Sequence, residues 1–460
     1  MNSNMKIIFF RFLVTLISLH SSLFTSLAQS DSVLVGSIPK NIEMIKVNGI
    51  VRRELSYLKN PFDGLYWKGP INQFSNQIDS ARTKIFISGG AYLKSNRLPF
   101  SFSKKIMQSG FIDSEIKSNA SIHAHNLNGI QVGYKYGAGF TTHLKKNIVG
   151  LEVSEESISI INYRRDLFNI IFGGNADYEN DTAFFQGSSF ANQDFHRLRI
   201  IFSKTSGQED SSWQLNGSVS YLQGYHVNLF KVGQTELFTA PMGEYLWMQS
   251  QFTYQANDAS NSGAFAFNGN GVSLDVCISF PAGKSELMFA INDAGFINWN
   301  RKSLLYRMDT AIYFEGIELE NILVNSGNSI NDINSDTILN YLGVSQATDA
   351  FNLNLPLRFT FIWNRLIDKN KINLNVGFSF LPQYENFPLF FASSTFNFIK
   401  FNPSLSVSYG GFQSFNIGVD LSGKISNHFC WQIGSGQLFS WVMPQNLTGA
   451  DLYTQFIYSF

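Results

Sequence analysis

Apolar and polar residues alternate with a period of two along much of the chain from Thr83 onward. From Ile372 to Phe380, one face carries Ile, Leu, Val and Phe, and the other carries Asn, Gly and Ser. The same alternation recurs in residues 130–136, 213–221, 272–280, 357–364 and 415–421. A period of two is typical of a strand with two unlike faces. The pattern therefore predicts an all-β protein.

The composition of the polar face indicates where these strands lie. A sheet face in water is normally rich in Lys and Glu, but here it carries mostly Ser, Asn, Gly and Gln, and only 15% of the chain is charged. Such a face suits a barrel lumen, and the Phe, Val and Leu face suits lipid. The sequence predicts a transmembrane antiparallel β-barrel over 83–460, with about 14 strands and a range of about 12 to 16. A secreted β-sandwich is the alternative.

Composition and charge exclude several other classes of protein. The mean hydropathy of −0.04 argues against a bundle of membrane-spanning helices. The 34 basic residues balance the 34 acidic ones, so there is no basic surface of the kind that binds nucleic acid. The two cysteines, Cys277 and Cys430, are too few for a disulfide framework and are interpreted as packed thiols, with one disulfide as the alternative.

The N-terminus has the three parts of a secretory signal peptide. Lys6 and Arg11 supply positive charge, apolar residues dominate 7–19, and Ser26-Leu27-Ala28 offers a small-x-small cleavage site. We expect a signal peptide over 1–28, cleaved between Ala28 and Gln29. A membrane anchor is the weaker alternative, because Arg11 leaves too short an apolar run. Residues 29–82 are less regular and are expected to form a plug or a periplasmic part.

The C-terminus carries a more specific signal. Leu452, Phe456, Tyr458 and Phe460 lie on one face of the last predicted strand. A terminal Phe on an amphipathic last strand resembles the assembly signal of bacterial outer-membrane barrels. The barrel assembly machinery and outer-membrane lipid are therefore expected partners.

Several segments resemble a known family. They are the stretch 292–302 with Asp293, Gly295, Phe296 and Trp299, the turn at Glu315-Gly316, Leu222-Gln-Gly224 with Leu237-Phe-Thr239, and the ending from Trp431 to Phe460. They are similar to an uncharacterised Bacteroidota outer-membrane family known as domain of unknown function 5723. The resemblance implies a barrel related in architecture to those that accompany type IX secretion and gliding. It implies no activity, and nothing catalytic is carried over.

Candidate chemistry is sparse. His123 and His125 would share one strand face and could begin a zinc or copper site, but no third ligand follows at motif spacing. Arg197 and Arg199 also share a strand face. They could select anions in a pore, although pairing with lumen acids such as Asp275 or Asp420 is preferred. Trp299 is interpreted as an aromatic girdle residue at the bilayer interface.

The connections between strands suggest an orientation. The segment 308–357 holds seven acidic residues and no Lys or Arg, whereas 368–371 and 426–428 look like short turns. Counting strands back from a periplasmic C-terminus places the short turns inside and the acidic segment outside. Short helices are expected over 104–117 and 317–323.

These observations lead to an ordered set of functional expectations. The first is a non-enzymatic binding or assembly component of the outer membrane, associated with a secretion or gliding complex. The alternative is a passive or substrate-selective channel, and an outer-membrane hydrolase is a distant third. No catalytic residue, cofactor, metal or nucleic-acid partner is expected.

Overall fold

The computed structural model describes residues 83–108, 112–144, 147–206, 213–283, 285–315, 343–367, 372–385, 387–396, 401–426, 428–444 and 447–460. The expected signal peptide with its Ala28–Gln29 cleavage site, the segment 29–82 and the helix expected over 317–323 lie outside the described residues.

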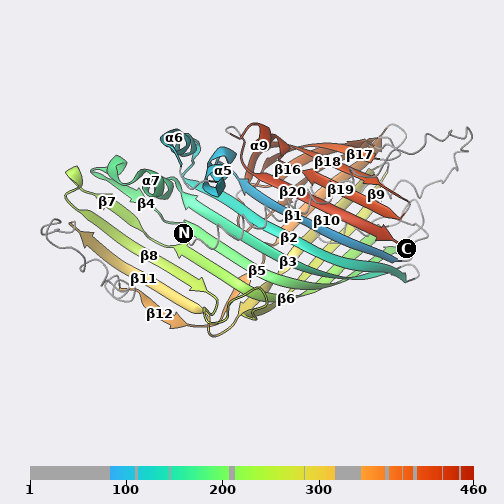
Figure 1. Ribbon diagram of the computed structural model, residues 1–460, viewed down its shortest axis with the longest axis horizontal. Coiled ribbons are helices and arrows are strands. Elements are labelled where there is room, and N and C mark those ends of the chain that lie inside the picture. The colour runs from blue at the N-terminus through green and yellow to red at the C-terminus, as the bar shows by residue number, and fades with distance from the viewer. Residues whose placement is uncertain are drawn as a thin grey trace, which may run out of the picture.

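Fourteen described strands close into one antiparallel barrel, which confirms the predicted transmembrane fold (Figure 1). Each strand pairs with the next around the wall, and the last pairs with the first. In order, they are β1 (Thr83–Ser95), β2 (Leu127–Leu144), β3 (Asn147–Arg164), β5 (Ser189–Ser206), β6 (Trp213–Val232), β9 (Gly269–Ala282), β10 (Ser285–Trp299), β14 (Arg358–Ile367), β15 (Ile372–Phe380), β16 (Leu389–Phe396), β17 (Phe401–Gly410), β18 (Gln413–Lys424), β19 (Phe429–Ser435) and β20 (Ala450–Ser459).

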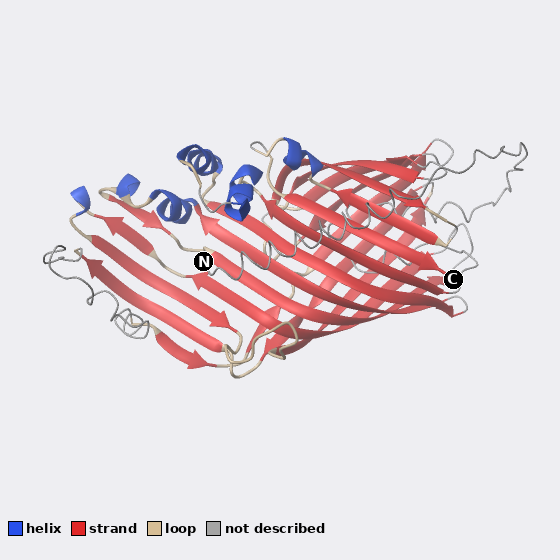
Figure 2. Ribbon diagram, in the orientation of Figure 1, coloured by secondary structure: helices blue, strands red, loops and turns tan. Residues whose placement is uncertain are grey.

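The wall has two heights. Strands β14 to β20 have 7 to 12 residues, close to the 9–11 that cross a bilayer when tilted. Strands β2, β3, β5 and β6 have 18 to 20 residues. Their extra length continues past the ends of the shorter strands on one side of the barrel (Figure 2).

A flap of shorter strands extends this tall side. Strand β6 pairs with β9 through 214–224 and with β8 through 228–232, so the sheet branches there. The remaining strands are β4 (Asp181–Phe184), β7 (Glu236–Thr239), β8 (Leu246–Ala256), β11 (Leu304–Phe314), β12 (Ser345–Thr348) and β13 (Phe351–Asn354). Strands β4, β7, β8, β11 and β12 form the flap, and β13 pairs with β10 on the barrel wall.

Short helices lie at the same end as the flap, away from the C-terminus (Figure 1). They are α5 (Phe100–Gln108), α6 (Ser114–His123), α7 (Arg165–Gly173), α9 (Leu438–Val442), η1 (Ala176–Tyr178) and η2 (Pro241–Gly243). None of the described helices is long and apolar enough to cross a bilayer. The single helix expected over 104–117 is wrong: α5 ends at Gln108, and the Asp113 side chain accepts the Ile116 N–H to begin α6.

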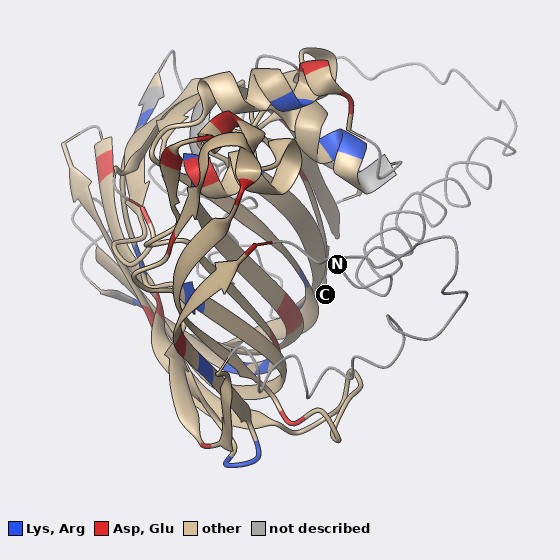
Figure 3. Cartoon of the chain, turned by 90° about the vertical axis from the view of Figure 1, so that its left-hand side faces the viewer, with Lys and Arg blue, Asp and Glu red and all other residues tan. Residues whose placement is uncertain are grey.

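The predicted faces of the strands are confirmed. On β15, Asn373, Asn375 and Ser379 are buried, whereas Val376 is 42% exposed on the opposite face. Figure 3 shows how little of the barrel wall is charged. The connections β14–β15 and β18–β19 lie at the end of the barrel where the chain ends, as expected. That this end faces the periplasm stays a prediction.

The C-terminal strand forms the seam of the barrel. β20 pairs with β1 from Lys84↔Ser459 to Leu93↔Ala450 and with β19 on its other side. Leu452, Phe456, Tyr458 and Phe460 are each 40% exposed or more, so they point away from the lumen. The Phe460 N–H donates to the Thr83 carbonyl at 2.9 Å. The last residue is thus both an outward aromatic and part of the closing ladder.

We predict that deleting Phe460 lowers the yield of assembled barrel in cells, while purified protein still folds in detergent. One outward side chain is worth only about 1.5–3 kcal/mol, so the main effect is on recognition of the strand during assembly. Heat-modifiable migration on gels measures the folded fraction.

The matched control is Phe415→Ala, which removes a half-exposed outward aromatic from β18 without touching the chain end. Equal cellular yields for the deletion and this control would contradict an assembly role for the terminal residue.

Candidate functional site

The barrel lumen is occluded in this structure. Every strand of the wall has at least one inward side chain that is buried, and Ser218, Asn373 and Asp420 are 0% exposed. An open, water-filled lumen would leave such polar groups accessible. The candidate site is therefore the lumen itself and the groups that shut it.

A buried ionic network spans the wall from β2 to β10, with its charged members on β2, β3, β5, β9 and β10 and with β6 between β5 and β9. Its members are Lys135, Glu152, Glu156, Arg197, Arg199, Asp275 and Asp293. Arg199 Nη1 lies 2.9 Å from Glu152 Oε2, and Arg199 Nε lies 3.4 Å from Asp275 Oδ2. Lys135 Nζ lies 3.3 Å from Glu152 Oε1. Period-two geometry places these side chains together, because all of them point inward from neighbouring strands.

The second half of the network depends on a β-bulge. Arg197 Nε lies 3.0 Å from Glu156 Oε1, and its Nη2 lies 2.7 Å from Asp293 Oδ1. The register of β10 against β9 shifts between Ile291 and Ala294, and Asp293 has φ 58°. An extra residue in a strand turns a side chain that regular pleating would place elsewhere. The Asp293 N–H also donates to Asp275 at 2.8 Å.

This network decides between the two interpretations of the arginines. Both pair with carboxylates of the lumen, and Arg199 pairs with the predicted Asp275. The other suggested partner, Asp420, is wrong. It lies on β18, where it accepts hydrogen bonds from Gln432 at 2.9 Å and Tyr453 at 2.8 Å. Three cations face four anions in the network, so almost no charge is left to select ions.

An apolar cluster lies beside the network, toward the flap end of the lumen. Its buried members are Phe195, Leu222, Val227, Ile297, Trp299 and Leu355. The expectation that Trp299 is a girdle residue is wrong, because its side chain is 0% exposed. Gly224 and Gly269 make room for the indole: a Cβ on them would lie 2.6 Å and 3.0 Å from its ring atoms. The other motif residues separate: Gly295 lies against β9, and Phe296 points outward.

The turn between β17 and β18 bends across the mouth of the lumen. Gly410 and Gly411 have φ 104° and 59°, which an L side chain rarely adopts. The buried Phe412 ring reaches β2, where a Cβ on Gly129 would lie 2.6 Å from its Cε1. Strands β19, β20 and β1 separate β18 from β2 around the wall. The ring therefore crosses the mouth. We call residues 410–412 the mouth turn.

Glu385 lies against the mouth turn, in the connection between β15 and β16. Its Oε2 accepts the Leu381 N–H at 2.9 Å, and a Cβ on Gly411 would lie 2.8 Å from its Oε1. Burial raises the pKa of the Glu385 carboxyl to about 7, although the Leu381 hydrogen bond and the charges of Arg358 and Lys94 oppose that rise. This carboxyl changes charge near neutral pH while it contacts the turn.

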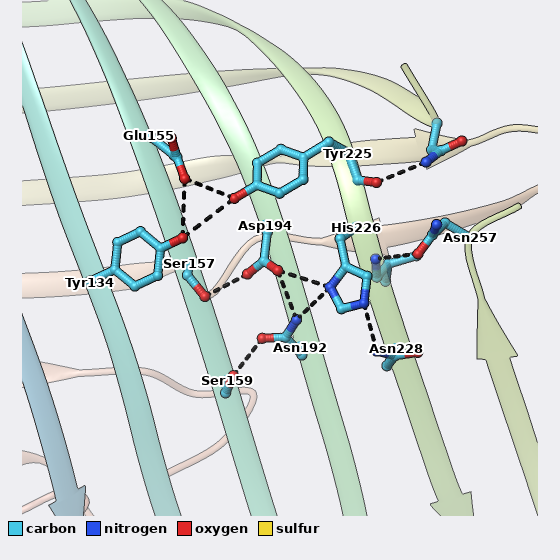
Figure 4. Close-up of polar contacts among 12 residues, drawn as sticks. Tyr134, Glu155, Ser157, Ser159, Asn192, Asp194, Tyr225, His226, Asn228 and Asn257 are labelled. Atoms are coloured by element: carbon cyan, nitrogen blue, oxygen red, sulfur yellow. Dashed lines mark hydrogen bonds and ion pairs between the residues drawn. The ribbon is translucent and has the colours of Figure 1, made fainter. Parts of the chain in front are cut away.

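A second polar network lies on the outer surface of the tall wall (Figure 4). Glu155 accepts hydrogen bonds from Tyr134 and Tyr225 at 3.1 Å and 3.0 Å, and Asp194 contacts His226 at 2.8 Å. A register shift between β5 and β6 brings Tyr225 and His226 to this same side. These hydrogen bonds tie β2, β3, β5 and β6 together on the outer surface of the tall wall. The polar groups of this network are hydrogen-bonded to one another.

Other predicted residues are not brought together. His123 ends helix α6 and His125 follows it, so the expected shared strand face is wrong. Within the described ranges, no group of three His, Cys, Asp or Glu side chains is arranged to hold a metal ion. Cys277 and Cys430 are not joined in a disulfide, in agreement with their interpretation as thiols.

Sequence reasoning missed the acids of the ionic network and the mouth turn. Glu152 and Glu156 could have been found from their period-two spacing with inward Ser154. Gly410-Gly411 between two alternating runs is an ordinary hairpin signal. Nothing local in the sequence indicates that Phe412 reaches β2.

Comparison with protein families gives one match, over residues 86–431, to the family of unknown function DUF5723. The chain belongs to this DUF5723 family. The match covers most of the barrel wall, from β1 to β19, and confirms the family resemblance. A search of curated protein sequences returned no match.

Comparison with solved structures gives matches to transporters, channels and a translocator domain. The toluene transporter TodX of P. putida has a TM-score of 0.40 and 8% identity, over 82% of this chain and 90% of that one. The toluene transporter TbuX of Ralstonia pickettii has a TM-score of 0.42 and 6% identity, over 87% and 93%. The translocator domain of the autotransporter NalP from Neisseria meningitidis has 0.30 and 8%, over 84% and 90%. At this similarity, the likeness concerns the barrel fold alone.

We predict that Arg199→Met lowers the free energy of unfolding of the DUF5723 barrel by about 3–5 kcal/mol, because it leaves Asp275 buried without its ion-pair partner and Glu152 with Lys135 alone. Urea unfolding from lipid vesicles, followed by tryptophan fluorescence, measures the change. Leu198→Ala is the matched control on the adjacent, outward position of the same strand. A loss no larger than that of the control would show that the ion pairs do not hold the wall.

Proposed function

We propose that this protein is an outer-membrane channel for small polar solutes, shut in the present conformation. The supporting observation is the inner wall, where every strand carries at least one buried polar side chain beside the apolar cluster around Trp299. A barrel that stayed permanently dry would be more stable with apolar residues inside, because burying a polar group without a partner costs free energy. A polar wall suits a passage that holds water part of the time.

Unpaired hydroxyl groups support the same proposal. Ser88 on β1, Ser273 on β9 and Ser406 on β17 are inward and buried, and their hydroxyls have no hydrogen-bond partner among the described residues. They are spread around the wall and are not gathered in one binding pocket. Water in an opened lumen would satisfy them, so opening recovers part of the cost of burying them.

The balanced charge of the wall indicates the class of solute. The buried network carries three cations and four anions, each within contact distance of an opposite charge. Selection by charge needs a ring of like charges. The proposed cargo is therefore a small neutral or zwitterionic solute.

The proposal includes a cellular setting. The barrel fold and the apolar outer belt support the outer membrane of a bacterium, and the family resemblance supports a member of the Bacteroidota. The proposed role requires no enzymatic activity, no cofactor and no resident metal.

A binding or assembly component beside a secretion or gliding complex is the second candidate. The tall wall with its flap favours it, because strands β2 to β6 and β8 to β11 present surface beyond the membrane. Affinity purification from native membranes tests it: a stoichiometric partner supports this role, and a barrel that always purifies alone contradicts it.

For the channel, we predict that wild-type protein in liposomes admits arabinose slowly and that the double variant Glu156→Gln, Arg197→Gln admits it several-fold faster. The two amides keep hydrogen-bonding capacity without the Glu156–Arg197 ion pair, and Lys135 keeps Glu152 as its partner. Asp293 loses Arg197, but its side chain is 22% exposed and can be hydrated. Liposome swelling measures the flux.

Cys277 reports the same opening inside one molecule, because it is an inward thiol that is 0% exposed. Its labelling by a charged thiol reagent, in a Cys430→Ser background, should be faster in the double variant. Leu198→Ala is the control for both measurements. Neither flux nor labelling above wild type in the double variant would contradict the channel.

A further inference from the structure

We propose that the mouth turn is a lid over the lumen, held shut by Phe412 against Gly129 and released when Glu385 becomes ionised. This inference rests on the proposed channel and concerns its regulation. It names a latch, which is the Phe412 contact, and a trigger, which is the Glu385 carboxyl.

The latch is a contact between elements that are far apart in the sequence and in the wall. Phe412 is 4% exposed, and its ring fills the space that the missing side chain of Gly129 leaves on β2. The Asn162 side chain on β3 borders the same space. Only a glycine accepts the ring at this position, because any Cβ would lie well inside van der Waals distance of it. Lifting the turn breaks this aromatic contact and the hydrogen bond from the Gly411 N–H to the Phe387 carbonyl, and it leaves the β17–β18 pairing of 401–408 with 416–423 intact.

The turn is built to move as a unit. Its two glycines carry the positive φ angles, and the Gly411 N–H donates to the Phe387 carbonyl at 3.1 Å. A Cβ on Gly410 would collide with the Pro388 carbonyl, so the turn lies directly on the β15–β16 connection. A change in that connection is therefore passed to the turn through backbone contact.

The trigger is the carboxyl in that connection. Glu385 is 9% exposed, and Gly411 approaches its Oε1 while the Leu381 N–H donates to its Oε2. The charged groups that act on it are Arg358 on β14 and Lys94 on β1, and Asp451 on β20 acts on Lys94 in turn. Both cations favour the carboxylate, yet burial outweighs them and keeps the acid neutral up to about pH 7.

The sign of the pH effect follows from this shift. The shut state holds a carboxyl whose pKa is raised from 4.5 to about 7, so it binds a proton more tightly than a hydrated carboxyl does. Its contribution to the shut state is complete below about pH 4.5 and is lost as the pH rises through about 7. Lifting the turn exposes the carboxylate to water. Alkaline conditions therefore favour the open lid, and acidic conditions favour the shut one.

The test places a reporter beneath the lid. Gln131 on β2 is inward and 2% exposed, two residues from Gly129. Gln131→Cys is made in full-length protein that lacks both native thiols, through Cys277→Ser and Cys430→Ser, and is labelled in lipid vesicles with a charged methanethiosulfonate. The same reporter in a Glu385→Gln chain, which stays neutral at all pH values, cancels the effect of pH on the thiol itself.

We expect the labelling rate of the Glu385 chain, divided by that of the Glu385→Gln chain, to rise about tenfold from pH 6 to pH 8, as the ionised fraction rises from about 0.1 to about 0.9 around a pKa of about 7. Phe412→Ala should label fast at both pH values. Glu115→Gln, an exposed acid on α6, and Phe415→Ala, an outward aromatic on β18, are the matched controls.

The outcomes separate the lid from the channel. A flat ratio together with slow labelling in Phe412→Ala overturns the lid, even if the double network variant still conducts arabinose. A tenfold ratio with no flux in any variant supports the lid and overturns the channel. Parallel increases in labelling and arabinose flux with pH support both proposals.

Discussion

The whole structure depends on one constraint: a backbone inside a bilayer must satisfy every N–H and C=O from its own chain. A sheet can do this only by closing on itself. The seam between β20 and β1 is therefore as important as any side chain, because an open edge there would leave a row of unpaired groups in lipid. Closure also fixes the faces, since each strand then sends alternate side chains into lipid and into the lumen.

The closed wall explains why charges concentrate where they do. Outward positions in the belt cannot carry charge, so the ionisable groups of the membrane-spanning part are inward, where neighbouring strands place opposite charges within contact. The Arg197–Asp293 pair depends on the β-bulge in β10. One residue departs from the regular pleat there, and its side chain can then contact Arg197. Above the belt, where the outer surface meets water, polar groups return to the outside around Glu155 and Asp194.

Glycines and aromatic rings together determine how the lumen is filled. Trp299 lies over Gly224 and Gly269, and Phe412 lies over Gly129. In each case, a large ring occupies the space that another strand leaves free. Contacts of this kind shut a wide barrel without a separate plug from the described residues, and releasing one of them leaves most of the strand pairing in place. A lumen shut by such ring contacts is compatible with transport. A lumen filled by hydrogen-bonded strands is not.

The sequence by itself determined the fold class, the lumen and lipid faces of strands such as β15, the approximate strand number and the outward aromatics of β20. All of these follow from period-two alternation and chain-end composition, which are local properties. The sequence also predicts a helix near Lys104 and two cysteines that form no disulfide, although it predicts one helix where α5 and α6 form.

Only the tertiary structure decided the site. Trp299 looks like an interfacial residue until the register brings two glycines beside it. Asp420 looks equivalent to Asp275 until the order of strands places it beside Gln432 and Tyr453. The Phe412–Gly129 contact joins residues nearly three hundred positions apart along the chain. Alternation fixes which face a side chain takes, but its partners are fixed by closure and shear of the barrel, and these are properties of the whole sheet.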